Sequence, residues 1–353
     1  MKALILCGGE DKNLTPISYT IPKELIPIGN KPLLVYTIEL LLKSGINELA
    51  IVVNAFNKPI FEKVLKYYLK KDFQYLIEKE SKGIVHALLL AEEFIKGDKF
   101  IMLLGDNFFD FDLKSFISNF EEEEMTCKIL LKEVEEPEKF SVAYIGNGRI
   151  IDLEERPKMA FSNWAITGLY AFNKNIFEAS KAIEDSNKGQ YQIVNVVKWL
   201  MGNGHKVGYE KLKGSWRDID SPSELIEQNI DILSSVEENI AGEVINSKVS
   251  GKIILMEGST VYNSIIRGPI VIGQNTTIKN SYIGPYTSIG NGVTIDKSNI
   301  ENSIILDRCN IWGIEDPIDS SVIGEGSTIM GTRSVKKSHK IIVGRNSKVY
   351  LGV

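Results

Sequence analysis

Apolar and polar residues follow two different rhythms along the 353-residue chain, and the rhythm changes near Ile254. From Met1 to about Ser235, short apolar runs alternate with segments whose apolar residues recur at helical spacing. The apolar runs predict strands at 2–7, 49–53, 73–77 and 100–104. The amphipathic segments predict helices at 32–44, 58–68 and 84–94. This order predicts an α/β fold with a Rossmann-like, mixed and mostly parallel sheet, covered on both faces, whose ligands bind at the carboxyl ends of the strands.

Beyond Ile254, an isoleucine recurs at steps of five or six residues and is often followed by glycine. The pairs are Ile272-Gly273, Ile283-Gly284, Ile289-Gly290 and Ile323-Gly324, and Ile278 and Ile295 hold the same place without glycine. This period is typical of a parallel β-helix, in which each coil has three short sides with one inward aliphatic residue per side. A β-sandwich would instead show turns about every 8–12 residues.

The two rhythms predict two domains, 1–238 and 239–353. A polar stretch over 233–244 predicts a linker between them, and the tail over 334–353 is expected to be irregular. The ends of a β-helix expose unpaired strand edges, which invite contacts with another subunit. We therefore expect a homo-oligomer.

The composition narrows the possible functions. Hydrophobic residues make up 43% and charged residues 25%, as in soluble globular proteins. The sequence has no run of eighteen apolar residues and no signal-peptide pattern, which predicts a cytoplasmic protein without a membrane partner. The net charge of −5 gives no general attraction to nucleic acid polymers. Three cysteines far apart, Cys7, Cys127 and Cys309, indicate neither a disulfide framework nor a zinc site.

The loop after the first predicted strand contains candidate phosphate chemistry. It reads LCGGEDKNLTP from Leu6 to Pro16. Gly8 and Gly9 suit a backbone bent around a phosphate. The acidic residues that follow oppose phosphate binding, and Lys12 is the only cation in the stretch. The loop alone does not decide between a phosphate site and a tight turn.

Further motifs decide it by resemblance. They are, in chain order, LCGGEDKNLTPIS, PKELIPIGNKPL, SKGIVHAL, LLGDNFF, EERPK, AITGLYAF and SWRDIDSPSELIEQN. In this order and spacing the chain resembles the sugar-1-phosphate nucleotidylyltransferases, most closely the long form of glucose-1-phosphate thymidylyltransferase. The resemblance covers essentially the whole chain. It implies a nucleotide-diphospho-sugar transferase fold followed by a left-handed β-helix. It also implies a reaction in which a sugar 1-phosphate and a nucleoside triphosphate give a nucleotide-sugar and pyrophosphate.

The resemblance assigns the catalytic and metal-binding residues. Asp106 and Asp218 match the two carboxylates that hold Mg²⁺, an ion that takes few protein ligands and keeps several waters. Lys23 matches the lysine that touches the nucleotide's phosphates, and the prolines around it favour a fixed position. Lys12 is a further catalytic candidate because it stands beside the place of a family arginine.

The resemblance also assigns the binding residues for nucleotide and sugar. The nucleotide-binding set is Leu6, Gly8, Gly9, Asn13, Glu24, Glu78 and Gly83. The set for the sugar and its phosphate is Ser141, Glu155, Arg156, Thr167, Gly168 and Tyr170. Arg156 replaces the usual lysine, and a guanidinium can grip a phosphate with two parallel hydrogen bonds.

Several of these positions depart from the family pattern. Asp11, Lys12 and Asn13 stand where the family has glycine, threonine and the arginine that stabilises the leaving pyrophosphate. Losing such a cation typically costs a factor of about 10³–10⁵ in rate. Ser141 and Asp220 replace glycines.

A second group of departures lies in one short stretch and at the predicted base site. The stretch carries Gln190, Gln192, Val194 and Asn195 where the family has acids and a threonine. Glu24 and Glu78 replace glutamines that read the base. An ionised carboxylate only accepts hydrogen bonds, so the preferred base stays open between thymine or uracil and guanine.

Two hypotheses follow, and the sequence leaves both open. The first is an active nucleotidylyltransferase with altered loop chemistry. The second is an impaired or inactive relative that binds nucleotide or nucleotide-sugar and regulates or scaffolds an active partner. An acyltransferase activity of the β-helix would require a histidine base between coils. It is disfavoured because the chain has only His86, His205 and His339.

Overall fold

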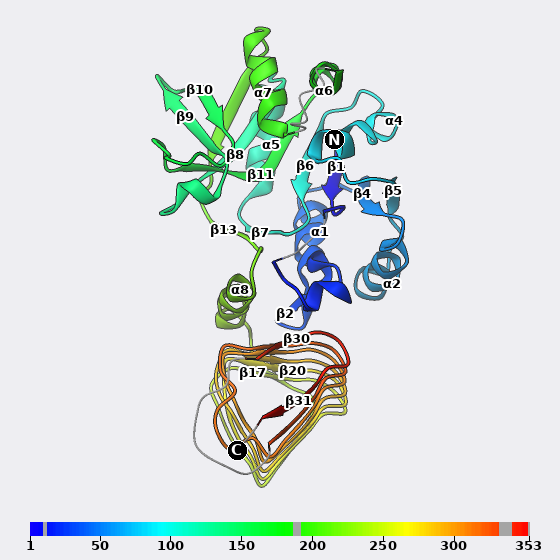
Figure 1. The fold of residues 1–353 in the computed structure, drawn as a ribbon, viewed down its shortest axis with the longest axis vertical. Coiled ribbons are helices and arrows are strands. Elements are labelled where there is room, and N and C mark those ends of the chain that lie inside the picture. The colour runs from blue at the N-terminus through cyan, green and yellow to red at the C-terminus, as the bar shows by residue number, and fades with distance from the viewer. Residues whose placement is uncertain (10–12, 186–191, 332–340, 352–353) are drawn as a thin grey trace. The chain divides into compact units, whose positions relative to one another are not determined.

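The computed structural model describes residues 1–9, 13–185, 192–331 and 341–351. They divide into two compact units, Met1–Glu10 with Leu34–Asp218 and Asp11–Leu33 with Ile219–Val353. The first unit contains a mixed sheet with its helices, and the second contains a β-helix (Figure 1). This division groups residues by contact, so the domain boundary after residue 238 stays a prediction.

The sheet of the first unit has nine strands among the described residues. Their order is β10-β9-β11-β6-β1-β4-β5, and β8 pairs with β11 and with β12. The strands are β1 (Lys2–Leu6), β4 (Leu49–Asn54), β5 (Gln74–Glu78), β6 (Phe100–Leu104), β8 (Cys127–Glu133), β9 (Val142–Gly146), β10 (Arg149–Glu154), β11 (Trp164–Phe172) and β12 (Val207–Lys211). β1, β4, β5 and β6 run parallel, and β11 runs antiparallel to β6 and β8. The predicted Rossmann-like mixed sheet is confirmed.

Helices accompany this sheet at the places where the chain shows helical periodicity. They are α1 (Leu33–Lys43), α2 (Lys58–Leu69), α3 (Ile84–Leu89), α4 (Glu92–Ile95), α5 (Leu113–Glu122), α6 (Asn175–Asp185) and α7 (Ile193–Gly202). The single helix predicted over 84–94 is wrong, because it is divided into α3 and α4. At Ala91 the backbone N–H bonds to the carbonyl of Leu88, three residues back, and this tighter turn separates the two helices.

A separate two-stranded sheet is formed by β7 (Asn107–Asp110) and β13 (Ser215–Asp218). It is antiparallel, and it pairs Asn107 with Asp218. Asn107 directly follows Asp106 in the chain, so this pairing brings Asp106 near Asp218, which is far from it in sequence.

The second unit begins with residues that pack on α8 (Pro222–Ser234) and on the β-helix. These residues form two short 3₁₀ turns, Ile17–Tyr19 and Lys23–Leu25, and the strand pair β2 (Pro27–Ile28) and β3 (Lys31–Pro32). Asn229 of α8 is fully buried; it accepts a hydrogen bond from the Gly29 N–H at 2.9 Å and donates one to the Tyr286 carbonyl at 3.0 Å. Asn30 donates to the Ile289 carbonyl at 2.6 Å. These bonds place the segment that carries Lys23.

The β-helix has three parallel sheets, visible as a stack of triangular coils in Figure 1. One contains β14 (Asn239–Ile240), β17 (Ile253–Leu255), β20 (Ile270–Ile272), β23 (Thr287–Ile289), β26 (Ile304–Ile305), β28 (Val322–Ile323) and β30 (Ile342–Val343). The second contains β15 (Glu243–Ile245), β18 (Thr260–Tyr262), β21 (Thr277–Lys279), β24 (Thr294–Asp296), β27 (Asn310–Trp312), β29 (Thr328–Gly331) and β31 (Lys348–Leu351). The third contains β16 (Lys248–Ser250), β19 (Ile265–Arg267), β22 (Tyr282–Ile283) and β25 (Asn299–Ile300). The predicted left-handed parallel β-helix is confirmed.

The isoleucine–glycine pairs of the sequence have a clear physical cause. The isoleucines fill the interior: Ile272, Ile289 and Ile323 are at most 1% exposed. A Cβ on Gly273 would lie 2.6 Å from backbone atoms of Gly290 in the next coil. The glycines therefore allow successive coils to approach at this corner.

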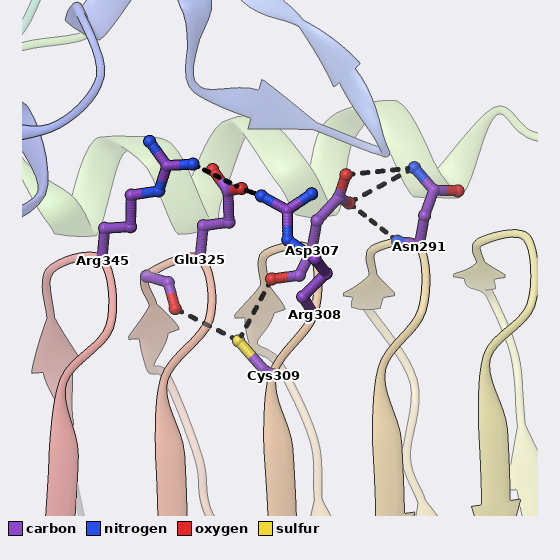
Figure 2. A network of polar contacts seen from close by, with 7 residues as sticks. Asn291, Asp307, Arg308, Cys309, Glu325 and Arg345 are labelled. Carbon is purple, nitrogen blue, oxygen red and sulfur yellow. Dashed lines mark hydrogen bonds and ion pairs between the residues drawn. The ribbon is translucent and has the colours of Figure 1, made fainter.

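The same corner carries a row of polar side chains from successive coils, drawn in Figure 2. Asp307 accepts a hydrogen bond from the Asn291 backbone N–H at 2.7 Å, and Glu325 pairs with Arg308 and with Arg345. These contacts satisfy charged groups that stacking brings close together. We assign them a structural role.

The junction and the tail are more regular than the sequence predicts. Part of the predicted linker over 233–244 joins the β-helix, because β14 and β15 pair with β17 and β18. The tail is also partly regular, since β30 and β31 add further strands to two sheets. The short strands of both segments have few inward residues. Both segments are therefore polar, and the sequence pattern does not reveal these strands. His339 lies outside the described residues.

Candidate active site

The first unit contains a cavity of about 260 Å³ beside Leu104, the last residue of β6. The predicted site residues that line it are Gly83, Ser141, Glu155, Arg156, Thr167, Gly168, Tyr170 and Asp218. They come from segments far apart in the chain. The whole predicted sugar set therefore surrounds one cavity, together with one predicted metal ligand.

One side of the cavity is formed by an irregular part of β11. The register between β11 and β8 shifts between Ile166 and Tyr170, and Gly168 there has a φ of 77°. A side chain at Gly168 would be strained in this left-handed conformation, and its Cβ would lie 2.9 Å from the Leu104 side chain. Thr167 is buried and donates a hydrogen bond to the Leu130 carbonyl at 2.9 Å. The bulge thus shapes the cavity by backbone geometry.

Tyr170 is the buried aromatic residue of this wall, with 3% of its surface exposed. Burial raises the pKa of its hydroxyl well above the usual value, and the negative charge of Glu155 raises it further. The hydroxyl therefore stays protonated across the physiological pH range. It is a hydrogen-bond donor beside a carboxylate that accepts.

The cavity is also lined by polar and charged residues from outside β11. The Ser141 hydroxyl donates to the Glu155 carboxylate at 2.5 Å. Arg156 has a φ of 39°, a left-handed conformation that is uncommon for residues other than glycine. Lys139 also lines the cavity, and its ammonium bonds to Glu136. The sequence analysis missed Lys139, since a lysine among glutamates reads as a solvated surface residue.

Asp106 and Asp218 are joined by one buried amide. Asn107, only 1% exposed, donates from Nδ2 to Asp106 Oδ1 at 2.8 Å and to Asp218 Oδ1 at 3.3 Å. Its Oδ1 accepts a hydrogen bond from the Trp216 indole N–H at 2.6 Å, which fixes the orientation of the amide. The structure thus brings both predicted metal ligands to one side chain. The signal for Asn107 was its place directly after Asp106 in LLGDNFF.

The predicted base-reading residue Glu78 ends β5 and is 4% exposed. One of its oxygens lies 3.3 Å from His86 Nδ1 at the start of α3. The other lies so close to Gly8 that any side chain there would collide with it. A residue larger than glycine at position 8 would therefore require the Glu78 carboxylate to shift, and His86 is a partner that the sequence analysis did not assign.

The second unit holds the other predicted site residues that are described. Lys23 and the buried Glu24 lie in the turn Lys23–Leu25, and Asn13 lies shortly before them in the chain. Asn13 and Lys23 both contact Asp220. Asp11, Lys12 and Gln190 lie outside the described residues.

The remaining predicted positions differ in their surroundings. Gln192 lines the cavity, so one of the departures in the stretch near α7 faces the predicted sugar site. Val194 is 2% exposed and packs in the core of the first unit, where an apolar side chain fits. Leu6 is 8% exposed, and Gly9 has open space around it.

Comparison with known proteins identifies the family. The family model described as "Nucleotidyl transferase" matches residues 2–235. A glucose-1-phosphate thymidylyltransferase from Streptomyces antibioticus is 34% identical over 99% of both chains. The low-salt glycan biosynthesis nucleotidyltransferase Agl11 from Haloferax volcanii is 32% identical over 99% of this chain and 100% of its own.

A solved structure agrees. The crystal structure of a Bacillus anthracis protein, titled as a glucose-1-phosphate thymidylyltransferase in complex with sucrose, has a TM-score of 0.62 and 29% identity. The similarity covers 68% of this chain and 97% of that one. The chain belongs to the nucleotidyl transferase family. The resemblance to sugar-1-phosphate nucleotidylyltransferases is confirmed, and with it the assignment as a nucleotidyltransferase.

Nucleotidyltransferases of this family typically work with a divalent metal ion, and the aspartate pair fits one. Hard cations such as Mg²⁺ need oxygen ligands and few of them from protein. Among the described residues, no three His, Cys, Asp or Glu side chains gather as a denser metal site. Asp106 and Asp218, which share the Asn107 amide, offer the right oxygens in the right number.

Among the residues that the structure describes, no helix combines the length and the apolar character that crossing a membrane requires.

Proposed function

We propose that this nucleotidyltransferase joins a hexose 1-phosphate to a nucleoside triphosphate and releases pyrophosphate. The observation that carries the proposal is the cavity that gathers the predicted sugar residues beside Asp218. Its polar groups include a donor, Tyr170, and an acceptor, Glu155, as sugar hydroxyls require. Arg156 supplies a cation for the phosphate of the sugar.

The reaction requires the sugar phosphate to attack the α-phosphorus of the triphosphate while pyrophosphate leaves. Catalysis of such a transfer is mainly positioning and stabilisation of negative charge. In this proposal Asp106 and Asp218 hold Mg²⁺, which neutralises charge on both phosphates when bound. Lys23 contacts the phosphates of the nucleotide. Asn107 keeps the two carboxylates in register through its two donated hydrogen bonds.

The names of the relatives guide the choice of substrates. Thymidylyltransferases that act on glucose 1-phosphate place dTTP and glucose 1-phosphate first among the pairs to test. Glu78 keeps the base choice open, because a carboxylate accepts from a ring N–H but gives nothing to a carbonyl. A guanine edge, which presents an N–H and an amino group, is the alternative.

The test is release of pyrophosphate with Mg²⁺ and a panel of nucleoside triphosphates and hexose 1-phosphates. We expect turnover with at least one pair and production of the matching nucleotide-sugar. The variants Asp106→Asn and Asp218→Asn should lose this turnover. Asp110→Asn is their matched control, because Asp110 is an exposed carboxylate on the same strand as Asn107.

Two outcomes contradict the proposal in different ways. Nucleotide binding without turnover by any pair would favour the alternative, a relative that binds and regulates or scaffolds an active partner. The hydrogen bond between Asn13 and Asp220 is the observation that favours this alternative. Asn13 stands at the position of the family arginine, and it is bound to a carboxylate of its own chain. Absence of any nucleotide binding would reject both functions.

We also propose that the protein forms a homo-oligomer through the first coil of the β-helix. β14, β15 and β16 are the terminal strands of the three sheets. Ile240 and Val244 hold inward positions, opposite the buried Leu255 and Val261, yet are 44% and 39% exposed. A second copy of the same coil would cover these side chains. Val244→Lys should then shift the mass measured by light scattering toward the monomer, whereas an unchanged mass would reject this interface.

A further inference from the structure

Asn13, Lys23 and Asp220 form a cluster around one carboxylate. The Asn13 amide donates from Nδ2 to Asp220 Oδ2 at 2.8 Å. The Lys23 ammonium lies 3.4 Å from the other oxygen, Oδ1. Lys23 is 14% exposed and Asp220 41% exposed, so the pair is only partly open to water. A single carboxylate thus engages both a residue of the glycine loop and the predicted phosphate-binding lysine.

Asp220 is held in place by the start of α8. Its backbone N–H donates to the Glu224 carboxylate at 2.8 Å, and the Glu224 N–H donates to the Ser221 hydroxyl at 3.3 Å. This reciprocal arrangement closely resembles a capping box, which fixes the chain at a helix N-terminus. The backbone of Asp220 is therefore fixed before any ligand binds.

The charges of the cluster bear on phosphate binding. The carboxylate of Asp220 offsets the positive charge of Lys23, so a triphosphate must compete with it for the ammonium. By resemblance, the family has an arginine at position 13 and a glycine at position 220. An arginine placed at position 13 of this chain would meet a carboxylate already in hydrogen-bond reach, and guanidinium–carboxylate pairs are strong. The two departures from the family pattern are therefore in contact.

We propose that Asp220 is a positioning residue that sets how much positive charge Lys23 offers to the triphosphate, and that Asn13 and Asp220 act as one coupled pair. An arginine at position 13 then serves the triphosphate only when the carboxylate at position 220 is absent. The inference rests on the proposed function, since it takes Lys23 as a contact of the nucleotide's phosphates.

The test is a double-mutant cycle with the wild-type chain, Asn13→Arg, Asp220→Gly and the double variant. The measured quantities are the dissociation constants of Mg²⁺–dTTP and Mg²⁺–GTP by calorimetry, and kcat and KM from pyrophosphate release. We expect Asn13→Arg alone to change affinity less than about threefold and Asp220→Gly to tighten it about threefold. The double variant should exceed the product of the single effects by about tenfold, as for other contacting pairs.

Two further variants separate charge from structure. Asp220→Asn keeps the size of the side chain and removes its charge. It should tighten binding as Asp220→Gly does, and the gain should shrink at high ionic strength. Glu257→Gln, an exposed carboxylate of the β-helix, controls for net charge and should leave affinity unchanged.

The failures are distinguishable. If the effects of Asn13→Arg and Asp220→Gly simply multiply in the dissociation constant, the two residues are independent and the proposal is wrong. If Asp220→Asn lowers the unfolding temperature without changing affinity or its salt dependence, Asp220 is only structural and the proposal is also wrong. No binding of Mg²⁺–dTTP or of Mg²⁺–GTP by any variant would likewise overturn it. Binding that follows the predicted cycle without turnover would support it while rejecting the proposed catalytic function.

Discussion

The cavity beside Tyr170 and the cluster around Asp220 use polar groups in opposite ways. In the cavity, residues from distant segments surround a hollow of about 260 Å³. In the cluster, Asn13 and Lys23 bind a carboxylate of their own chain. A ligand adds contacts in the first region, whereas it must exchange contacts in the second. Both regions contain departures from the family pattern: Ser141, Arg156 and Gln192 line the cavity, and Asn13 and Asp220 contact each other in the cluster.

This difference teaches that departures from a family pattern are better judged in contact than one by one. Along the sequence, Asn13 and Asp220 are two unrelated losses at a catalytic site. In the structure the two side chains are hydrogen-bond partners. A carboxylate at position 220 would bind an arginine at position 13, so the two departures are best considered together. The cavity allows the opposite comparison. If its residues keep the roles that the resemblance implies, removing them should lower activity most for those that act most directly in the reaction.

The largest effect is expected for the two predicted metal ligands, Asp106 and Asp218. Asp218→Asn or Asp106→Asn should lower kcat by about 10³-fold or more, since phosphoryl transfer depends on charge stabilisation. The measurement is pyrophosphate release over a range of Mg²⁺ concentrations. The unfolding temperature should stay within a few degrees, because both side chains are partly exposed. A variant that retains full activity would remove the metal site from this pair.

Much of the fold was predictable because its signals are local. The isoleucines of the β-helix recur at short steps, since each side of a coil buries one aliphatic residue. Four strands of the sheet, β1, β4, β5 and β6, were predictable as apolar runs. The division of the helix over 84–94 was not, because the pattern of apolar residues continues through the turn at Ala91 while only the hydrogen bonding changes.

The candidate site was predictable as a set of residues and unpredictable as a set of contacts. The resemblance supplied many of the residues that line the cavity but not, for example, Lys139 or Trp216. It gave no sign that Asn107 links Asp106 to Asp218, or that Asp220 binds Asn13, because both contacts join segments more than a hundred residues apart. Such contacts depend on the tertiary arrangement, which no local pattern encodes.

The second prediction concerns the link between the carboxylates. Asn107→Leu keeps a similar side-chain volume and removes the two hydrogen bonds that Asn107 donates. It also removes the oxygen that accepts a hydrogen bond from the Trp216 indole N–H. We expect a fall of about 10–100-fold in kcat/KM, with a higher Mg²⁺ requirement, as for other residues that orient metal ligands. Asn47→Leu is the matched control, because Asn47 is exposed. An unchanged Mg²⁺ requirement would limit Asn107 to a packing role.

A smaller effect is expected for the hydroxyl of Tyr170. Tyr170→Phe removes one donor that burial keeps protonated. The KM for the sugar 1-phosphate should rise about tenfold, the usual cost of one hydrogen bond to substrate, while the KM for the nucleotide stays the same. Tyr144→Phe removes a similar hydroxyl that donates to Glu154 at 2.9 Å on strands of the same sheet. Equal changes in the two variants would contradict a direct contact between Tyr170 and the sugar.

The smallest effect is expected at Ser141, where the two regions become alike. Ser141 lines the cavity, yet its hydroxyl already bonds to Glu155 at 2.5 Å, so a sugar must exchange this contact as a triphosphate must in the cluster. Ser141→Gly restores the family residue and frees Glu155 to accept from a sugar hydroxyl. We expect the KM for the sugar 1-phosphate to fall about threefold, because one hydrogen bond to a carboxylate replaces another and little net energy is gained.

Ser141→Ala separates the two causes, since alanine keeps the Cβ and lacks the hydroxyl. An equal fall in KM for both variants assigns the effect to the hydrogen bond, and a fall for glycine alone assigns it to crowding by the Cβ. Ser162→Gly is the control, because the Ser162 hydroxyl bonds to the Ala143 carbonyl at 2.6 Å. A rise in KM for both Ser141 variants would show that the serine holds Glu155 in place for the sugar. The cavity would then be preorganised by its own polar contacts, and the contrast with the Asp220 cluster would reduce to one of charge.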